Sequence, residues 1–268
     1  MVGGCRTRGS AAPNGGVDRS VESYGPERGQ EGEWFLPSDG DRLRVVVLVH
    51  GGFWRPGYDR HLEDDVALLL AGEGLAVWNV DYASADTPWP STFRDAAAAM
   101  DHLAESRHRA RLDLDRVAVV GHSAGGHLAL WLAARAELPD GAVGAGPRVR
   151  ARVAVAQAPV ADLVTAAREE VGAGAVLDLM DGGPDDQPGR YAICSPRALL
   201  PLRDVRITLV HGDADEVVPP RQSTSYADAA RALGMEVGLQ LLEGVGHFEH
   251  LEPGGDAVAA MLAALREV

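Results

Sequence analysis

The chain has 268 residues, of which 46% are hydrophobic and 24% are charged, and this composition indicates an ordinary folded domain. It carries 25 basic and 39 acidic residues, so its formal net charge is −14. Such a chain repels phosphate backbones and anionic lipid, and we expect neither a nucleic-acid nor a membrane partner. Every basic residue is arginine, which excludes mechanisms that need a lysine amine, such as Schiff-base chemistry or a P-loop.

The two cysteines, Cys5 and Cys194, are too few for a cysteine-ligated zinc site, and they do not require a disulfide. No apolar run reaches the roughly 18 residues that a membrane-spanning helix needs. Residues 1–20 lack the apolar stretch of a signal peptide. We therefore expect a cytoplasmic protein, with a disordered tail over residues 1–20 and one folded domain over residues 21–268. A homodimer is an assembly that the sequence leaves open.

Short apolar runs alternate with longer amphipathic runs along the chain. Edge strands are expected within residues 17–36, and buried strands over residues 45–50, 75–80, 116–121, 152–157, 205–211 and 237–242. Helices are predicted over residues 62–71, 92–105, 125–136, 222–233 and 256–266. This alternation predicts an α/β fold with a mostly parallel central sheet and helices on both faces.

Residues 158–202 separate two predicted strands by about 45 residues, which is too long for one plain crossover. The segment contains a helical piece at 160–171, a turn region rich in Gly, Asp and Pro at 181–189, and a short piece near 195–199. An insertion at the carboxyl ends of the strands would lie over the ligand crevice of such a sheet. We therefore interpret residues 158–202 as a small lid.

The sequence from Gly121 to Gly125 (GHSAG) matches the pattern G-x-S-x-G. It comes directly after a predicted buried strand and directly before a predicted helix, which is the setting that a nucleophile elbow requires. The start of the helix places backbone N–H groups and the positive end of the helix dipole beside Ser123, where they favour negative charge. Ser123 is the predicted nucleophile.

The segment from His50 to Trp54 (HGGFW) follows the first strongly buried strand. Acyl transfer needs hydrogen-bond donors aimed at the developing oxyanion, and glycine lets a loop present its backbone N–H groups. The N–H groups of Gly52 and Phe53, with that of Ala124 after the serine, are the predicted oxyanion hole.

A carboxylate must orient the base histidine and stabilise its cation. Asp215, in the loop after the strand ITLV, is the preferred acid, and Asp213 and Asp162 are its rivals. His247 follows the last strand and is the preferred base, because the chain order is then Ser, Asp, His. His250 is the local competitor.

The remaining candidates concern the substrate and metals. Trp54 and Tyr82 lie in loops after strands and are predicted to bind substrate, in a pocket completed by residues 177–180 of the insertion. No HExxH pattern is present, and we expect neither a metal nor another cofactor. His122 and His127 are expected to support packing.

With these motifs, the chain resembles the α/β-hydrolase superfamily from about Tyr24 to its end. Four motifs carry the resemblance in the expected order: HGGFW, GHSAGG, HGDADEVVP and GVGHF. The HGG-aromatic-Trp loop and GHSAGGHLAL are similar to the small-lid esterases and kynurenine formamidases. The chain has Phe53 where hormone-sensitive-lipase-like esterases have a third glycine, so it looks unlike that branch.

The resemblance implies a Ser–His–Asp hydrolase without a cofactor. The preferred function is hydrolysis of a small carboxylic ester, and the alternative is an arylformamidase that hydrolyses N-formyl-kynurenine. A prolyl-oligopeptidase-type peptidase, an acyltransferase and a non-catalytic binding module on the same fold also remain open.

Overall fold

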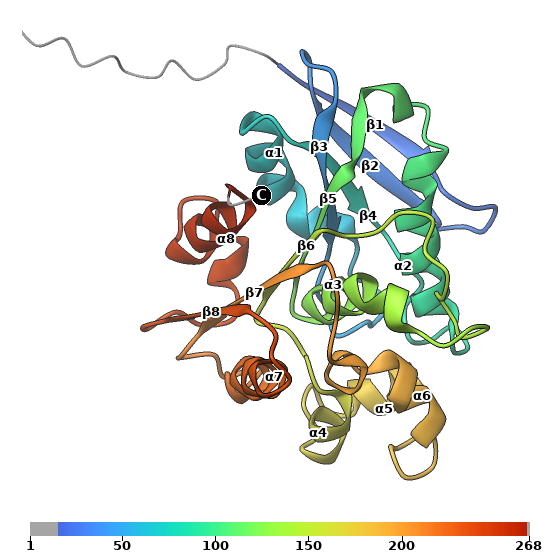
Figure 1. The fold of residues 1–268 in the computed structure, drawn as a ribbon, viewed down its shortest axis with the longest axis vertical. Helices are drawn as coiled ribbons and strands as arrows, with labels where there is room; N and C mark the ends of the chain where they lie inside the picture. The colour runs from blue at the N-terminus through green and yellow to red at the C-terminus, as the bar shows by residue number, and fades with distance from the viewer. Residues whose placement is uncertain (1–15, 267–268) are drawn as a thin grey trace, which may run out of the picture.

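The computed structural model describes residues 16–266, and its centre is one eight-stranded sheet with the order β1-β2-β4-β3-β5-β6-β7-β8 (Figure 1). The strands are β1 (Val17–Ser23), β2 (Glu31–Pro37), β3 (Leu43–Val49), β4 (Ala76–Val80), β5 (Leu112–His122), β6 (Val153–Gln157), β7 (Arg206–Gly212) and β8 (Val237–Leu242). β2 pairs antiparallel with β1 and β4, and the pairs from β4 through β8 are parallel. Central strands such as β4 and β6 are buried along their whole length, which explains their continuous apolar sequences.

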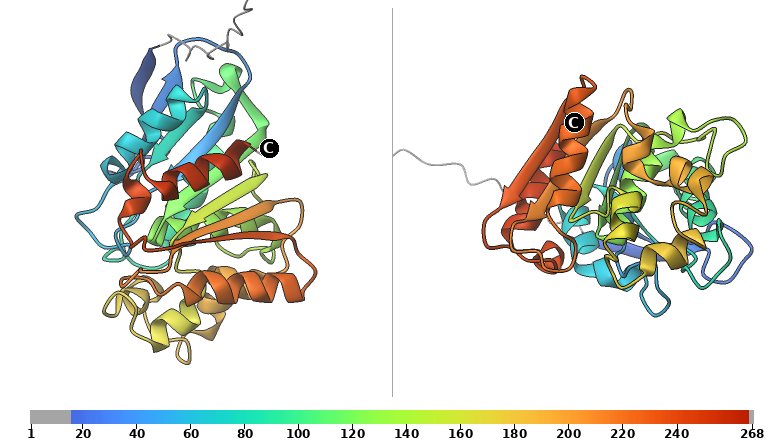
Figure 2. Two further views of the ribbon diagram at one scale, coloured as in Figure 1. Left: turned by 90° about the vertical axis from the view of Figure 1, so that its left-hand side faces the viewer. Right: turned by 90° about the horizontal axis from the view of Figure 1, so that it is seen from below.

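Helices cover both faces of this sheet. They are α1 (Asp64–Gly72), α2 (Ser91–Asp101), α3 (Ala124–Ala134), α4 (Leu163–Arg168), α5 (Ala175–Met180), α6 (Pro188–Cys194), α7 (Arg221–Ala232) and α8 (Asp256–Arg266). The apolar residues of α1 and α8 form one core cluster with one face of the sheet, and those of α2, α3 and α7 belong to the cluster on the other face. Figure 2 shows the helices arranged on both sides of the sheet. Every residue of α3 except Ala133 is buried, so this helix is enclosed on all sides.

This architecture confirms the predicted α/β-hydrolase fold. All six strands predicted as buried and all five predicted helices are present, with ends that differ by a few residues. The burial predicted for residues 237–242 is wrong: β8 is the last strand of the sheet, with one neighbour, and Val237 is its one buried residue. One boundary is wrong: residues 17–20 belong to strand β1, which pairs with β2, and not to a tail. Residues 1–15 of the predicted tail lie outside the described residues. None of the helices in the described part of the chain is long and apolar enough to span a bilayer.

The 158–202 insertion folds into three short helices, α4, α5 and α6, and a 3-10 turn at Pro196–Leu199. Sequence patterning predicted a helix near α4 but missed α5, and it placed the start of α6 in a turn. The three helices gather beyond one end of the sheet (Figures 1 and 2). Gly172 in this insertion lies beside Phe53, which follows β3, so the insertion is at the carboxyl edge of the parallel strands. Its role as a lid stays a prediction.

Candidate active site

Ser123 occupies the tight turn between β5 and α3. Its backbone has φ 58° and ψ −118°, a conformation that residues with a side chain rarely adopt. The turn is held from two sides, because Ser123 N donates to the carbonyl of Gln157 at 2.8 Å and Ser123 O accepts from His127 N at 3.0 Å. A strained serine at this position is typical of a nucleophile elbow.

Two glycines make the turn sterically possible. A Cβ at Gly121 would overlap the carbonyl group of Gly125, and a Cβ at Gly125 would overlap the carbonyl oxygen of Val49. The close approach of α3 to β3 and β5 therefore requires glycine at both positions of the G-x-S-x-G pattern. Ala124 is the first residue of α3, where a backbone N–H has no acceptor within the helix.

The loop after β3 lies against this turn. A Cβ built at Gly51 would be 3.3 Å from Ser123 Cβ and 3.1 Å from the carbonyl oxygen of His122. The next three residues all have positive φ: 107° at Gly52, 51° at Phe53 and 55° at Trp54. The structure thus brings the predicted oxyanion loop beside Ser123 in an unusual backbone conformation.

This loop is fastened to the segment that follows β4. Tyr82 Oη donates to the carbonyl of His50 at 2.8 Å, and the two rings stack with centroids 4.3 Å apart. Ala85 N donates to the carbonyl of Trp54 at 2.6 Å. Both ends of the loop are therefore held by hydrogen bonds to its backbone.

Trp54 and Tyr82, which were expected to bind substrate, both belong to the core cluster, and their contact with substrate stays a prediction. Trp54 is 1% exposed and meets the ring of His127 edge-on at 5.1 Å. Tyr82 is 8% exposed, and its hydroxyl is committed to His50. Both rings support the loop, because burying the surface of a large aromatic ring stabilises the packing around it. Two other aromatic residues are exposed here: Phe248, whose ring lies 5.2 Å from that of His247, and Tyr58, which packs over Gly52.

Asp215 and His247 form a buried pair. His247 Nδ1 donates to Asp215 Oδ2 at 2.7 Å, and the side chains are 4% and 0% exposed. The other oxygen of the carboxylate accepts from the backbone N–H groups of Val217 and Val218, each at 2.8 Å. Burial alone would raise the pKa of Asp215, but hydrogen bonds from His211 and His247 outweigh it and hold this pKa well below its usual range. The carboxylate is therefore ionised at neutral pH and keeps Nδ1 of His247 protonated.

The two rival carboxylates serve local backbone turns. Asp213 Oδ1 accepts from Gly244 N at 2.7 Å. Asp162 caps the N-terminus of α4 by accepting from Val164 N and Thr165 N. Of the three aspartates weighed from the sequence, Asp215 is the one that contacts His247.

Other histidines surround the pair. His122 Nε2 donates to the carbonyl of His247 at 2.8 Å, so the residue before Ser123 supports the loop that carries His247. His250 is fully buried, stacks on His122 at 5.6 Å, and burial lowers its pKa to about 4. His250 is thus part of the support around His247.

His211, near the end of β7, was expected to buttress its loop, and it does so; its approach to the Asp215 carboxylate was not predicted from the sequence. Its Nε2 donates to the carbonyl of Val218 at 2.9 Å and lies 3.2 Å from Asp215 Oδ2, while its Nδ1 accepts from Ser223 Oγ at 2.7 Å. The signal available in the sequence was its position four residues before Asp215 at the end of β7.

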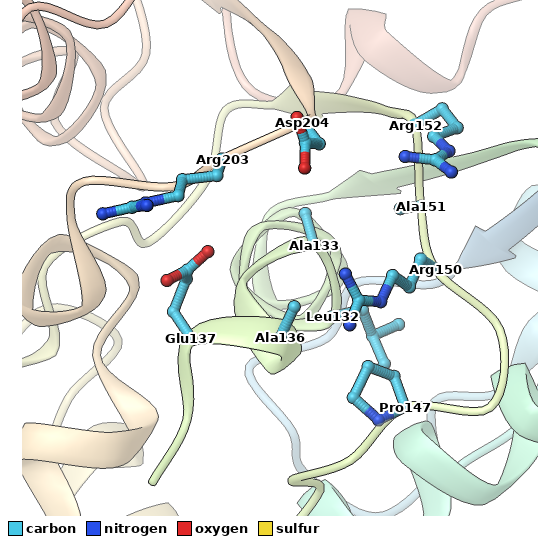
Figure 3. Close-up of a pocket in the computed structure, with 10 residues that line it drawn as sticks. All are labelled: Leu132, Ala133, Ala136, Glu137, Pro147, Arg150, Ala151, Arg152, Arg203 and Asp204. Carbon is cyan, nitrogen blue, oxygen red and sulfur yellow. The ribbon is translucent and has the colours of Figure 1, made fainter.

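Cavities lie on both edges of the sheet. An open groove of about 540 Å³ runs between the loop after β3 and the insertion, lined by Arg55, Pro56, Ala85, Asp86, Leu177, Asp178, Asp181 and Gly182. Figure 3 shows a smaller cavity of about 140 Å³ lined partly by Arg150, Arg152, Arg203, Asp204 and Glu137. Its residues precede β6 and β7, so it lies at the amino edge, away from Ser123. The groove beside the insertion begins at Arg55, directly after Trp54, and Ser123, Asp215 and His247 are not among its lining residues.

Within residues 16–266, the side chains of Glu33, His61 and Asp64 are close enough together to hold a metal ion. Arg19 already makes ion pairs with Glu33 at 2.9 Å and with Asp64 at 3.0 Å. The Arg19 guanidinium therefore already neutralises both carboxylates of this group.

Comparison with known proteins places the chain in a family. The BD-FAE family model matches residues 34–229. Carboxylesterase NlhH of Mycobacterium tuberculosis is 40% identical over 96 residues, or 35% of this chain and 30% of NlhH. Esterase LipC of the same organism is 27% identical over 234 residues, or 81% of this chain and 57% of LipC. The chain thus spans between about a third and just over half of these curated relatives.

Solved structures show the same fold. Esterase B from Lactobacillus rhamnosis superimposes with a TM-score of 0.81 at 20% identity, covering 96% of this chain and 86% of the esterase. A truncated carbohydrate esterase from gut microbiota has a TM-score of 0.80 at 18% identity, covering 96% and 98% of the two chains. At these identities the likeness establishes the α/β-hydrolase fold. With a family match over most of its length, the chain belongs to the BD-FAE family.

Proposed function

We propose that the protein is a serine hydrolase that cleaves small carboxylic esters through an acyl-enzyme. The observation that carries the proposal is the 2.7 Å hydrogen bond from His247 Nδ1 to the buried Asp215 carboxylate, in a fold that holds Ser123 in a strained elbow. The naming of the relatives as esterases supports an ester over the N-formyl amide that the sequence left open.

In this mechanism His247 is the general base. Its Nδ1 is bonded to Asp215, so Nε2 is the nitrogen that takes the proton of Ser123 while Oγ attacks the acyl carbonyl. His247 then gives that proton to the leaving alcohol as the tetrahedral intermediate collapses to the acyl-enzyme. Water, deprotonated by His247, attacks the acyl group, and the carboxylic acid and free Ser123 are released.

The negative charge of each tetrahedral intermediate is assigned to backbone N–H groups of Gly52, Phe53 and Ala124. The position of Ala124 at the start of α3 supports this role, since its N–H has no helical acceptor and lies at the positive end of the helix dipole. Gly52 and Phe53 belong to the loop that Gly51 brings against Ser123. Donors of this kind are each worth about 10²–10³ in turnover. The reaction consumes only the ester and water, so no cofactor enters the proposal.

The test is a paired assay of the purified protein and its Ser123→Ala variant with p-nitrophenyl acetate, p-nitrophenyl butyrate and N-formyl-L-kynurenine. Ser225→Ala, an exposed serine of α7, is the matched control. We expect ester turnover with an initial burst in the wild type and the control. In Ser123→Ala, we expect a loss of several orders of magnitude.

Labelling by a fluorophosphonate, followed by mass spectrometry, locates the nucleophile independently of substrate choice. We expect one adduct, on Ser123. Efficient release of formate with little ester turnover would transfer the proposal to the arylformamidase alternative. Equal turnover by Ser123→Ala and wild type would overturn the mechanism.

A further inference from the structure

Arg55 connects the oxyanion loop to the 158–202 insertion. It follows Trp54 directly, and its Nη2 donates to the carbonyl of Gly172 at 2.7 Å and to that of Ala173 at 3.0 Å. These two carbonyls lie in the turn between α4 and α5. The guanidinium therefore joins the loop after β3 to a turn whose two acceptor residues lie 117 and 118 positions further along the chain.

The same turn also packs against the loop. Gly172 has φ +71°, and a Cβ there would overlap the ring of Phe53. The ring thus rests directly on the backbone of Gly172, a contact that a larger residue would prevent. The insertion consequently holds the loop at two adjacent points, through Phe53 and through Arg55.

The loop needs such support because of its backbone. Phe53 and Trp54 are bulky residues at φ 51° and 55°, which costs energy and persists only where the surroundings impose it. The body of the domain holds the loop through the carbonyls of His50 and Trp54, as described above. Phe53, whose N–H is assigned to the oxyanion hole, lies between these two points, and there the contacts come from the insertion.

We propose that Arg55 is a positioning residue: by binding the turn at Gly172 and Ala173, it holds the backbone N–H donors of the oxyanion hole in place. The inference rests on the function proposed above and adds that the geometry of the oxyanion hole is coupled to the position of the insertion. When the turn at Gly172 and Ala173 is docked, Arg55 and Phe53 are held and the donors face the reacting carbonyl. When the turn moves away, Arg55 loses both acceptors and the strained loop relaxes. Competence of the hole thus depends on the position of the insertion.

The first test compares Arg55→Met with Arg168→Met. Arg168 is an exposed arginine of α4 that pairs with Asp185 at 3.2 Å, and both residues belong to the insertion. Replacing Arg168 therefore removes an ion pair within the insertion and leaves the contacts between Arg55 and the turn at Gly172 in place. For Arg55→Met we expect kcat/KM for p-nitrophenyl butyrate to fall about 10–100-fold, mainly in kcat, since misplacing a reacting group by an ångström can cost about 10². For Arg168→Met we expect a change below about twofold.

Inhibitor affinity separates positioning from substrate binding. A trifluoromethyl ketone forms a tetrahedral adduct with the serine and so reports on the oxyanion hole. Its affinity should fall by the same factor as kcat/KM in Arg55→Met. Arg55→Lys, which keeps one cationic donor group but loses the planar fork, should recover part of both losses. An unchanged inhibitor affinity in Arg55→Met, or equal effects of the two methionine variants, would overturn the proposal.

Hydrogen exchange tests the tie without any substrate. In Arg55→Met, amides of residues 51–55 and 170–175 should both exchange faster than in wild type, whereas Arg168→Met should leave residues 51–55 unchanged. If the wild type hydrolyses no ester, the proposed function fails, but this exchange comparison still tests whether Arg55 holds the loop against the insertion. Unchanged exchange at residues 51–55 in Arg55→Met would show that the arginine does not hold the loop.

Discussion

Asp215 and His247 are 32 residues apart in the chain, yet a 2.7 Å hydrogen bond joins the carboxylate of one to the imidazole of the other. They follow neighbouring parallel strands, β7 and β8, whose carboxyl ends meet at the same edge of the sheet. Both oxygens of the carboxylate have donors, and its low pKa keeps it ionised. The pair can therefore fix one tautomer of the histidine and stabilise its cation.

Replacing this acid should lower turnover while leaving the fold intact. For Asp215→Asn we expect kcat to fall about 10³–10⁴-fold, because an amide can donate to Nδ1 and so favour the wrong tautomer. Asp213→Asn is the matched control: Asp213 bonds only a turn amide, and its variant should keep kcat within a few fold. Steady-state kinetics with p-nitrophenyl butyrate measure both. A larger loss in Asp213→Asn would reassign the acid.

Gly125→Ala should destabilise the protein severely. The new Cβ would overlap the backbone oxygen of Val49, and neither β3 nor α3 can move without repacking the core. We expect a loss of at least about 3 kcal/mol, or no folded protein. Gly189→Ala in the exposed first turn of α6, where nothing lies within 4 Å of the new Cβ, should be neutral or slightly stabilising. Urea unfolding gives both values, and similar stabilities would contradict the steric argument.

Truncating Trp54 should lower stability, whereas truncating Phe248 should change substrate binding. Trp54 is 1% exposed, so Trp54→Ala should cost about 3–5 kcal/mol of unfolding free energy through the cavity it leaves. Phe248 is 64% exposed beside His247, so Phe248→Ala should change stability by less than about 0.5 kcal/mol. Phe248→Ala should instead raise KM for esters with large acyl or alcohol groups. Urea titration and kinetics distinguish the two, and a stable Trp54→Ala with a raised KM would restore Trp54 as a substrate contact.

Glu63 should make stability depend on pH. This residue is 1% exposed, its Oε1 has no hydrogen-bond partner among the described residues, and burial raises its pKa to about 8. A raised pKa means that the folded state holds the proton more tightly. Its contribution is therefore complete below about pH 4.5, the ordinary value, and is lost as pH rises through about 8.

The Glu63→Gln variant isolates this contribution, because glutamine stays neutral at every pH. Between pH 5 and 8, the unfolding free energy of Glu63→Gln should rise relative to wild type, by several kcal/mol in total at about 1.4 kcal/mol per pKa unit. Urea unfolding at several pH values measures the difference. A constant difference across this range would show that Glu63 does not titrate there.

Much of the site was predictable because its motifs are local. The elbow around Ser123 depends on a strand, small residues and a helix within a few positions, and all of these are visible in the sequence. Asp215 was chosen among three aspartates by its place after a strand, and the contact with His247 distinguishes it from Asp213 and Asp162.

The features that the sequence did not decide have a common physical origin. Trp54 was predicted to contact substrate because it follows a strand, but whether an aromatic side chain faces a pocket or the core depends on what packs against it. Here His127 and the segment after β4 enclose it. The helices α5 and α6 were missed because six or seven residues show little periodicity, and such short helices owe their stability to packing.

The sequence by itself determined the order of strands and helices along the chain, the tight turn at Ser123 and the glycine-containing loop at Gly52 and Phe53, because each depends on residues only a few positions away. The sequence preferred Asp215 among three aspartates, and the tertiary structure shows its contact with His247. Tertiary structure alone decided that His211 also approaches this carboxylate and that Arg55 reaches the turn at Gly172. These contacts join residues brought together by the parallel sheet and the insertion, and their distances follow from packing that no local pattern encodes.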